Sequence, residues 1–282
     1  MPWTRTGPLA SQFRSVLSVS SHFKVPEQGM KEYEMLSRGT AFCLSLPGPP
    51  RSPSKLVLVT CSHVLAPYKW RQHFKEPWLE FVKDEHVECR IQAWEQEEGD
   101  SSRGQLGGET RVQGLSTYHH TLDLCMLPVH KNTVDAYALK PLEDRDQGEP
   151  LAEGEELTFV GFPSAMSSPK GEQQEKLGVL PPRRVQGRTL ASICDKQGRF
   201  YAKTEERLAV GMSGGPVLDG HGRCCGIFQG ILPPPPQTPE EEKKQAASDL
   251  DPVLRPLQIE GWERHAGFIP LAAVRAFLED KK

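Results

Sequence analysis

GMSGGPV, residues 211–217, places a serine inside a glycine-dense turn directly before an apolar run. Glycine adopts positive φ at no steric cost, so the glycines around Ser213 let the backbone fold tightly about its hydroxyl group. Such a turn brings the N–H groups of Gly211 and Ser213 towards one point, where they would form an oxyanion hole. The alternative is a tight glycine-rich turn with an incidental serine.

A serine hydroxyl is a poor nucleophile and needs an imidazole to take its proton. His63 is the candidate base, because it follows the apolar run of residues 56–59 within TCSHVL, residues 60–65. The end of a strand would hold its ring at the rim of a β-barrel. A single histidine after a strand is more often a structural residue, so His63 gains weight only in combination with Ser213.

A third residue, a carboxylate, has to accept a hydrogen bond from the imidazole and fix its tautomer. Asp123 is the candidate, because it lies in the apolar stretch TLDLCML, residues 121–127. An unpaired acid in such a stretch costs several kcal/mol. The alternatives are that Asp123 caps a turn or pairs with an arginine.

The chain order His63, Asp123, Ser213 and the local context of each residue resemble the chymotrypsin-like serine proteases. Within that clan the chain is most similar to the HtrA/Deg protease domain. The resemblance implies a His63–Asp123–Ser213 catalytic triad buried between two six-stranded antiparallel β-barrels. The matching stretches are GTAF (39–42), TCSHV (60–64), LDL (122–124), VGFP (160–163), GMSGGPV (211–217), GI (226–227) and GFIP (267–270).

The sequence also departs from these families. Met212 stands where trypsin-type enzymes have Asp and HtrA enzymes usually have Asn, and there is no activation terminus of the Ile-Val-Gly-Gly type. We therefore expect no zymogen activation by a new N-terminal ammonium group. Only about a dozen residues follow Pro270, so we also expect no PDZ domain of the HtrA kind.

The family's spacing puts the base of the primary specificity pocket about six residues before the serine, near Arg207, and a wall of this pocket at Gly226 and Gly230. An arginine at the base would favour acidic substrate side chains through charge-assisted hydrogen bonds. The alternative is that Arg207 points to solvent beside Glu205 and Glu206.

The apolar pattern along the chain agrees with the implied all-β fold. Short β-branched or aromatic runs recur between Gly, Pro, Asp and Ser turns, which is typical of an antiparallel β protein. The polar, glycine-rich stretch 94–114 indicates a surface loop or disorder. Near the end of the chain the apolar spacing becomes helical and predicts a closing C-terminal α-helix, with Leu271, Val274, Phe277 and Leu278 on its buried face.

We expect three parts. Residues 1–29 form an N-terminal arm or a transit peptide. Residues 30–145 form the first β-barrel, which holds the histidine and aspartate of the triad. Residues 146–282 form the second β-barrel, which holds the serine, a Pro/Glu-rich loop at 231–258 and the C-terminal helix.

The composition argues against several classes of ligand. The formal net charge of −3 and the pI of about 6.3 give no basic excess for nucleic acid, so none is expected as a partner. The apolar runs are far shorter than the ~18 residues of a membrane span, and none is expected. The seven cysteines lack CxxC spacing, which favours free thiols over a zinc site. The proposed chemistry requires no metal or organic cofactor.

The first 24 residues carry Arg5, Arg14 and Lys24, contain several serines and have no acidic residue before Glu27. This profile is typical of a mitochondrial transit peptide. The alternative is a loosely docked or disordered arm on a cytoplasmic protein. HtrA relatives commonly form trimers through aromatic contacts in an N-terminal segment. Phe23 and Tyr33 would serve such a homotrimer, or else pack on their own barrel.

The sequence therefore predicts a serine endopeptidase acting on protein or peptide substrates. The alternative is a catalytically silent protease fold that serves as a binding or structural subunit of a larger complex, with its triad intact by descent. An esterase of the α/β-hydrolase type ranks last, because that fold has the order Ser, Asp, His.

Overall fold

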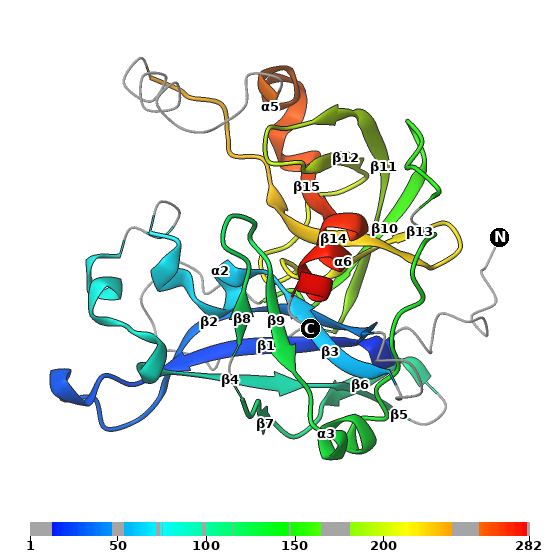
Figure 1. The fold of residues 1–282 in the computed structure, drawn as a ribbon. Helices are drawn as coiled ribbons and strands as arrows, with labels where there is room; N and C mark the ends of the chain where they lie inside the picture. Colours follow the sequence, from blue (N-terminus) through cyan, green and yellow to red (C-terminus); the bar gives the residue numbers. More distant parts are fainter. Residues whose placement is uncertain are drawn as a thin grey trace.

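A computed structural model of the chain describes residues 13–46, 54–71, 74, 76–97, 100–114, 116–146, 148–164, 181–238 and 254–280. Two antiparallel β structures follow one another along the chain, as Figure 1 shows. The first is a curled seven-stranded sheet with the order β7-β4-β1-β2-β3-β9-β8. Its strands are β1 (Val16–Phe23), β2 (Glu34–Leu46), β3 (Lys55–Thr60), β4 (Val87–Gln92), β7 (Thr110–Arg111), β8 (Thr117–Tyr118) and β9 (Cys125–Pro128).

The second structure is a closed barrel with the order β10-β11-β12-β15-β14-β13. Its strands are β10 (Glu156–Gly161), β11 (Arg183–Cys194), β12 (Phe200–Thr204), β13 (Pro216–Asp219), β14 (Cys224–Ile231) and β15 (His265–Pro270). The predicted all-β fold with a C-terminal helix is thereby confirmed. The first sheet differs in detail from the expected six-stranded barrel, because its end strands β7 and β8 have only two residues each and no described pairing joins them.

The remaining elements are short apart from the last helix. They are α2 (Ser62–Leu65), α3 (Lys131–Ala136), α5 (Arg255–Gly261), α6 (Leu271–Asp280), η1 (Phe13–Ser15), η2 (Pro26–Gln28), η3 (Pro67–Lys69), η4 (Pro77–Phe81), η5 (Asp84–His86) and η7 (Trp262–Arg264). Within the described ranges, no helix is both long enough and apolar enough to cross a membrane. All seven cysteines are free thiols.

The expected N-terminal arm is wrong from residue 16 onwards. β1 pairs with β2 on one side and with β4 on the other, and all eight of its residues are buried. The serine-rich composition suggests an exposed arm, but the serines of this strand are buried and form hydrogen bonds inside the domain. Ser20 Oγ bonds to His22 Nε2 at 3.0 Å, and Ser21 Oγ donates to the carbonyl of Val64 at 3.1 Å. Residues 1–12 lie outside the described chain, and the mitochondrial location stays a prediction.

Two expected loops also contain regular structure. Within 94–114 the strands β5 (Trp94–Glu97) and β6 (Asp100–Leu106) form a separate two-stranded sheet. Of the expected loop 231–258, residues 232–238 are irregular, 239–253 lie outside the described chain, and α5 begins at Arg255. Leu257 of α5 packs with Leu232 and Tyr201, so the end of this stretch is anchored to the barrel by apolar burial.

One apolar core extends from the first sheet into the second barrel. Phe42 and Leu58 of the sheet, Ile227 of the barrel and Val274 of α6 belong to the same buried cluster. In Figure 1, α6 lies where the two structures meet. The predicted apolar face of this helix is confirmed, since Leu271, Val274, Phe277 and Leu278 are all buried.

The buried state of β1 leads to a stability prediction. Leu17 is fully buried in the main core, so Leu17→Ala should lower the free energy of unfolding by about 2–5 kcal/mol. Glu32→Ala, which changes an exposed residue in the same part of the chain, is the control and should leave it unchanged. Thermal unfolding followed by circular dichroism measures both. An unchanged Tm in Leu17→Ala would mean that residues 16–23 are a detachable arm after all.

Candidate active site

His63 lies on α2, the single helical turn that follows β3. This turn is anchored from two directions. Ser62 Oγ donates to the carbonyl of Leu124 at 2.6 Å, and the carbonyl of Val64 accepts from Ser21 of β1 at 3.1 Å. The His63 side chain therefore projects from a backbone that is fixed on both sides, and 20% of its surface is exposed.

Asp123 lies two residues before β9 rather than within a strand, and only 3% of its surface is exposed. Its carboxylate accepts the His63 backbone N–H at 2.9 Å and contacts His63 Nδ1 at 2.5 Å. The amide Nε2 of Gln229, from β14, donates to the same carboxylate at 3.2 Å. Asp123 thus pairs with the predicted histidine, as the sequence indicates, and not with an arginine.

The charge of Asp123 is stabilised despite its burial. Burial by itself raises the pKa of this carboxyl group, but the His63 charge, two hydrogen bonds from His63 and the amide of Gln229 outweigh it, so the pKa lies below its usual value. An ionised carboxylate only accepts hydrogen bonds, so His63 Nδ1 carries the proton. The other ring nitrogen, Nε2, is left to accept one.

The serine turn has the conformation that its glycines predict. Gly211 and Gly214 have φ values of +91° and +85°. A Cβ atom on Gly214 would lie 2.2 Å from the carbonyl oxygen of Thr40, and one on Gly211 would lie 2.6 Å from that of Phe162. Both positions therefore require glycine, for its backbone conformation and for lack of space.

The backbone donors of this turn divide into two groups. The N–H of Gly214 donates to the carbonyl of Phe228 in β14, and the N–H groups of Met212 and Gly215 donate locally, to the carbonyls of Ala209 and Met212. Among the described residues, the N–H groups of Gly211 and Ser213 donate no hydrogen bond. These two are the donors that the sequence assigns to the oxyanion hole, and both are available for a ligand.

The serine turn is tied to the half of the site that carries His63. The backbone N–H of Thr40, in β2, donates to the carbonyl of Ser213 at 2.9 Å. Cys61 Sγ, two residues before His63, donates to the carbonyl of Phe228 at 3.4 Å. In the described part of the chain no hydrogen bond joins the Ser213 hydroxyl to the His63 ring, a contact that often forms only with bound substrate.

Met212 fills the position where related families have a polar residue. Its side chain is fully buried in the core of the second barrel. A Cβ atom on Gly161 of β10 would lie 2.8 Å from the Met212 Cα, which shows how closely the turn packs on this strand. The turn is anchored by apolar packing, and no charge partner is needed.

Arg207, expected at the base of the specificity pocket, is exposed and has partners on η7. Its guanidinium lies over the ring of Trp262 at 5.5 Å and pairs with Glu263 at 3.5 Å, and its side chain is 55% exposed. Both partners belong to η7. This arrangement favours the solvent-facing alternative and leaves the predicted preference for acidic side chains without support.

The two glycines expected in the pocket wall differ from each other. Gly226 is packed inside the barrel wall, because a Cβ atom there would lie 2.5 Å from the carbonyl oxygen of Ile269. Gly230 faces open space, with nothing within 4 Å of such an atom. Of the two, only Gly230 has open space beside it.

Sequence reasoning missed two residues of this site. Gln229 is 106 residues from its partner Asp123, and the Thr40 hydroxyl is 171 residues from the Gly211 carbonyl to which it donates. In the sequence, Thr40 stands out only as part of GTAF (39–42), one of the stretches that resemble the HtrA/Deg protease domain. No local pattern reports such distant pairings, and only the register of the strands could have found them.

Cys61, His63 and Asp123 together offer three potential metal-ligand atoms within 4.8 Å of one another. The hydrogen bonds of this group account for it without a metal. The Asp123 carboxylate is engaged by His63 and Gln229, and burial raises the pKa of the Cys61 thiol, which opposes the thiolate that a metal would bind.

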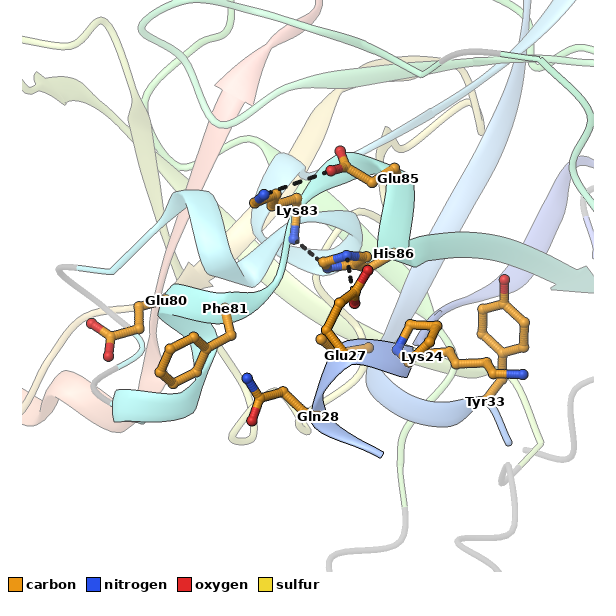
Figure 2. Close-up of a pocket in the computed structure, with 11 residues that line it drawn as sticks. Lys24, Glu27, Gln28, Tyr33, Glu80, Phe81, Lys83, Glu85 and His86 are labelled. Atoms are coloured by element: carbon orange, nitrogen blue, oxygen red, sulfur yellow. Dashed lines mark hydrogen bonds and ion pairs between the residues drawn. The ribbon is translucent and has the colours of Figure 1, made fainter. Parts of the chain in front are cut away.

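An open depression of about 520 Å³ lies elsewhere, on η2, η4 and η5 (Figure 2). Ion pairs cross it from Glu27 to His86 at 3.6 Å and from Lys83 to Glu85 at 3.9 Å. None of the three predicted triad residues lines it. The charged side chains that line the depression have both signs, and most of them pair with one another. The depression therefore does not favour a positive ligand over a negative one, or the reverse.

The aromatic residues expected at a trimer contact also lie in this region. Phe23 is buried and stacks on Trp78 of η4 with ring centroids 5.0 Å apart, so it packs within its own domain. Tyr33 is 39% exposed and lines the depression. Of the two, only Tyr33 is accessible to another copy of the chain, and the homotrimer stays a prediction.

Comparison with known proteins places these observations in a family context. A model of the trypsin-like peptidase domain matches residues 39–227. No curated protein matches the chain. The fold is similar to that of the serine endoprotease from Yersinia pestis, with 13% identity, a TM-score of 0.54, and coverage of 99% of this chain and 67% of that one. The active form of the Rv3671c protease from M. tuberculosis has 15% identity, a TM-score of 0.49, and coverage of 98% and 91%.

The lowered pKa of Asp123 predicts a pH effect on stability. A carboxyl group whose pKa falls on folding stabilises the native state above its unfolded pKa, about 3.9, and this contribution is lost as the pH falls through the folded value. When the pH is lowered from 7 to 3, the Tm of Asp123→Asn should therefore fall by a few °C less than the Tm of the wild type. The control Asp135→Asn changes an exposed acid on α3 and should follow the wild type. If the Tm of Asp123→Asn fell with pH as much as the Tm of the wild type, the lowered pKa of Asp123 would be contradicted.

Proposed function

The chain belongs to the trypsin-like peptidase family, and on this premise we propose that it is a serine endopeptidase that hydrolyses peptide bonds through an acyl-enzyme. The observation that carries the proposal is the double contact between His63 and Asp123, whose carboxylate meets both the backbone N–H and the ring Nδ1 of the histidine. This pairing fixes the tautomer and orientation that a general base requires.

In the first half of the reaction, Ser213 Oγ attacks the scissile carbonyl carbon while His63 Nε2 takes the hydroxyl proton. The carbonyl oxygen becomes an oxyanion in the tetrahedral intermediate. The N–H groups of Gly211 and Ser213, which have no other described acceptor, would donate to it. His63 then gives its proton to the leaving amine, and the C–N bond breaks to leave an ester on Ser213.

In the second half, water attacks this ester and His63 takes a proton from the water. Collapse of the second tetrahedral intermediate breaks the ester bond, and His63 returns the proton to Ser213. Asp123 stays ionised throughout and stabilises the imidazolium. The Gln229 amide supports this role because it donates to the same carboxylate. No step requires a metal or an organic cofactor.

The alternative, a silent protease fold that acts as a binding subunit, has one observation in its favour. Within the described residues the Ser213 hydroxyl makes no hydrogen bond to His63. Labelling with a serine-reactive fluorophosphonate separates the two functions, because only an activated serine reacts.

Ser213→Ala should abolish peptide-bond hydrolysis and fluorophosphonate labelling, because it removes the nucleophile. Its Tm should stay within a few °C of the wild type, because the backbone contacts of the turn remain. Hydrolysis of casein and mass spectrometry of the labelled peptide measure the two effects. The mechanism would be contradicted if the probe labelled the wild type at another residue, or if Ser213→Ala hydrolysed casein as fast as the wild type.

Asp123→Asn should lower kcat by about 10⁴-fold, because an amide that donates to His63 favours the wrong tautomer. KM should change much less, since the substrate does not contact this buried side chain. Asp135→Asn is the matched control and should leave kcat unchanged. Steady-state kinetics with one cleaved peptide measure both values, and a kcat within tenfold of the wild type would exclude Asp123 from the mechanism.

A further inference from the structure

Thr40, a residue of the first sheet, uses all of its polar groups, and three of its four hydrogen bonds reach the second barrel. It is fully buried. Its N–H donates to the Ser213 carbonyl at 2.9 Å, and its hydroxyl donates to the Gly211 carbonyl at 2.8 Å. The same hydroxyl accepts from the Phe162 N–H at 2.9 Å, and the Thr40 carbonyl accepts from the Thr60 hydroxyl at 2.7 Å.

The direction of each oxyanion donor follows from the carbonyl in the same peptide unit. A trans peptide is planar, so its N–H points opposite to its C=O. The carbonyls of Val210 and Met212 accept backbone hydrogen bonds at 2.8 and 3.0 Å. The Gly211 N–H therefore points away from Ser164 and the Ser213 N–H away from Gly215, the donors to those two carbonyls, and neither N–H meets a described acceptor.

The two peptide units that alternate with these are held at their carbonyl ends by Thr40, and at their N–H ends by the carbonyls of Ala209 (3.3 Å) and Phe228 (2.8 Å). The Thr40 hydroxyl fixes the Gly211 carbonyl and the Thr40 N–H fixes the Ser213 carbonyl. The turn needs this support, because Gly211 and Gly214 are both left-handed glycines with φ of +91° and +85°. Glycine rotates at little steric cost, so a peptide unit next to it depends on external bonds to keep its direction. For the Gly211–Met212 unit the Thr40 hydroxyl makes the shorter of the two bonds, 2.8 Å against 3.3 Å.

We propose that Thr40 is a positioning residue that aims the oxyanion donors of Gly211 and Ser213 from the opposite domain. The inference rests on the proposed endopeptidase function and adds a residue to it. The Thr40 hydroxyl touches neither substrate nor nucleophile, and it acts through the Gly211 carbonyl. Because the oxyanion exists only in the transition state and the intermediates, loss of this hydroxyl lowers the rate of reaction at Ser213 and leaves ground-state binding nearly unchanged.

The test compares two substitutions at Thr40. Thr40→Val keeps the shape and removes the hydroxyl group, whereas Thr40→Ser keeps the hydroxyl group and removes a methyl group. The probe is a fluorophosphonate, whose saturation kinetics at Ser213 separate the maximal rate of labelling from the binding constant. Thr40→Val should lose about 10–100-fold in maximal rate, somewhat less than the loss of a whole oxyanion donor. Thr40→Ser should stay within about threefold of the wild type in both values.

Thr204→Val is the matched control for the removal of a buried hydroxyl group. The Thr204 hydroxyl has its single proton to share between two backbone carbonyls, those of Glu206 at 2.8 Å and Arg264 at 3.0 Å. Its loss should lower Tm without changing the maximal rate of labelling. If Thr40→Val shows no cooperative unfolding transition, Thr40→Cys replaces it, because a thiol fits the same space and is a weak donor.

Each outcome decides the proposal. The positioning role is supported if Thr40→Val has a lower maximal rate of labelling and an unchanged binding constant, while Thr40→Ser labels at the wild-type rate. A Thr40→Val variant that is less stable but reacts as fast as the wild type makes Thr40 a structural residue only and overturns the proposal. Equal losses of rate in Thr40→Val, Thr40→Ser and Thr204→Val would reflect general destabilisation and also overturn it. A folded wild type without labelling at Ser213 overturns the proposed function itself, and the role of Thr40 with it.

Discussion

Hydrogen bonds that cross from one domain to the other hold this site together. The first sheet carries His63 and Asp123, and the second barrel carries the serine turn, but each half is completed by the other. Thr40 of the first sheet bonds to the carbonyls of the serine turn, and Gln229 of the barrel donates to Asp123. A buried carboxylate costs several kcal/mol unless it is paired, and the amide of Gln229 adds a third hydrogen bond to the two that His63 makes with Asp123.

The apolar core makes the same junction rigid. Residues of the first sheet, the barrel and α6 share one buried cluster. Arg275 of α6 adds polar contacts across it, because its guanidinium donates to the carbonyl of Ser45 and to Asp144 at 2.5 Å. Met212 anchors the serine turn by burial rather than by charge. A site built on such a junction keeps its geometry only while both domains stay packed, which suits the small tolerance of catalytic groups.

Local sequence patterns predicted the residues whose chemistry is local. The contexts of His63, Asp123 and Ser213 identified a histidine after a strand, a paired acid and a serine between glycines, and the structure pairs the first two directly. Helical spacing was enough for α6. The failures concern partners distant in sequence. Nothing local to β1 shows that it pairs with β2 and β4, so its composition predicts an arm. Counting residues puts Arg207 at the base of a pocket, whereas in the structure its partners are Trp262 and Glu263, far along the chain.

The order of strands in the barrel also fixes when the site assembles during synthesis. β15 lies between β12 and β14, so the barrel closes only after residue 270 has left the ribosome. The first sheet needs nothing beyond β9 for its own pairing, and domains fold as units from the N-terminus. A nascent chain therefore presents the His63–Asp123 pair long before the serine turn is anchored. We therefore expect the proposed hydrolase to gain activity only once β15 has closed the barrel, which would spare its own unfinished chain from cleavage.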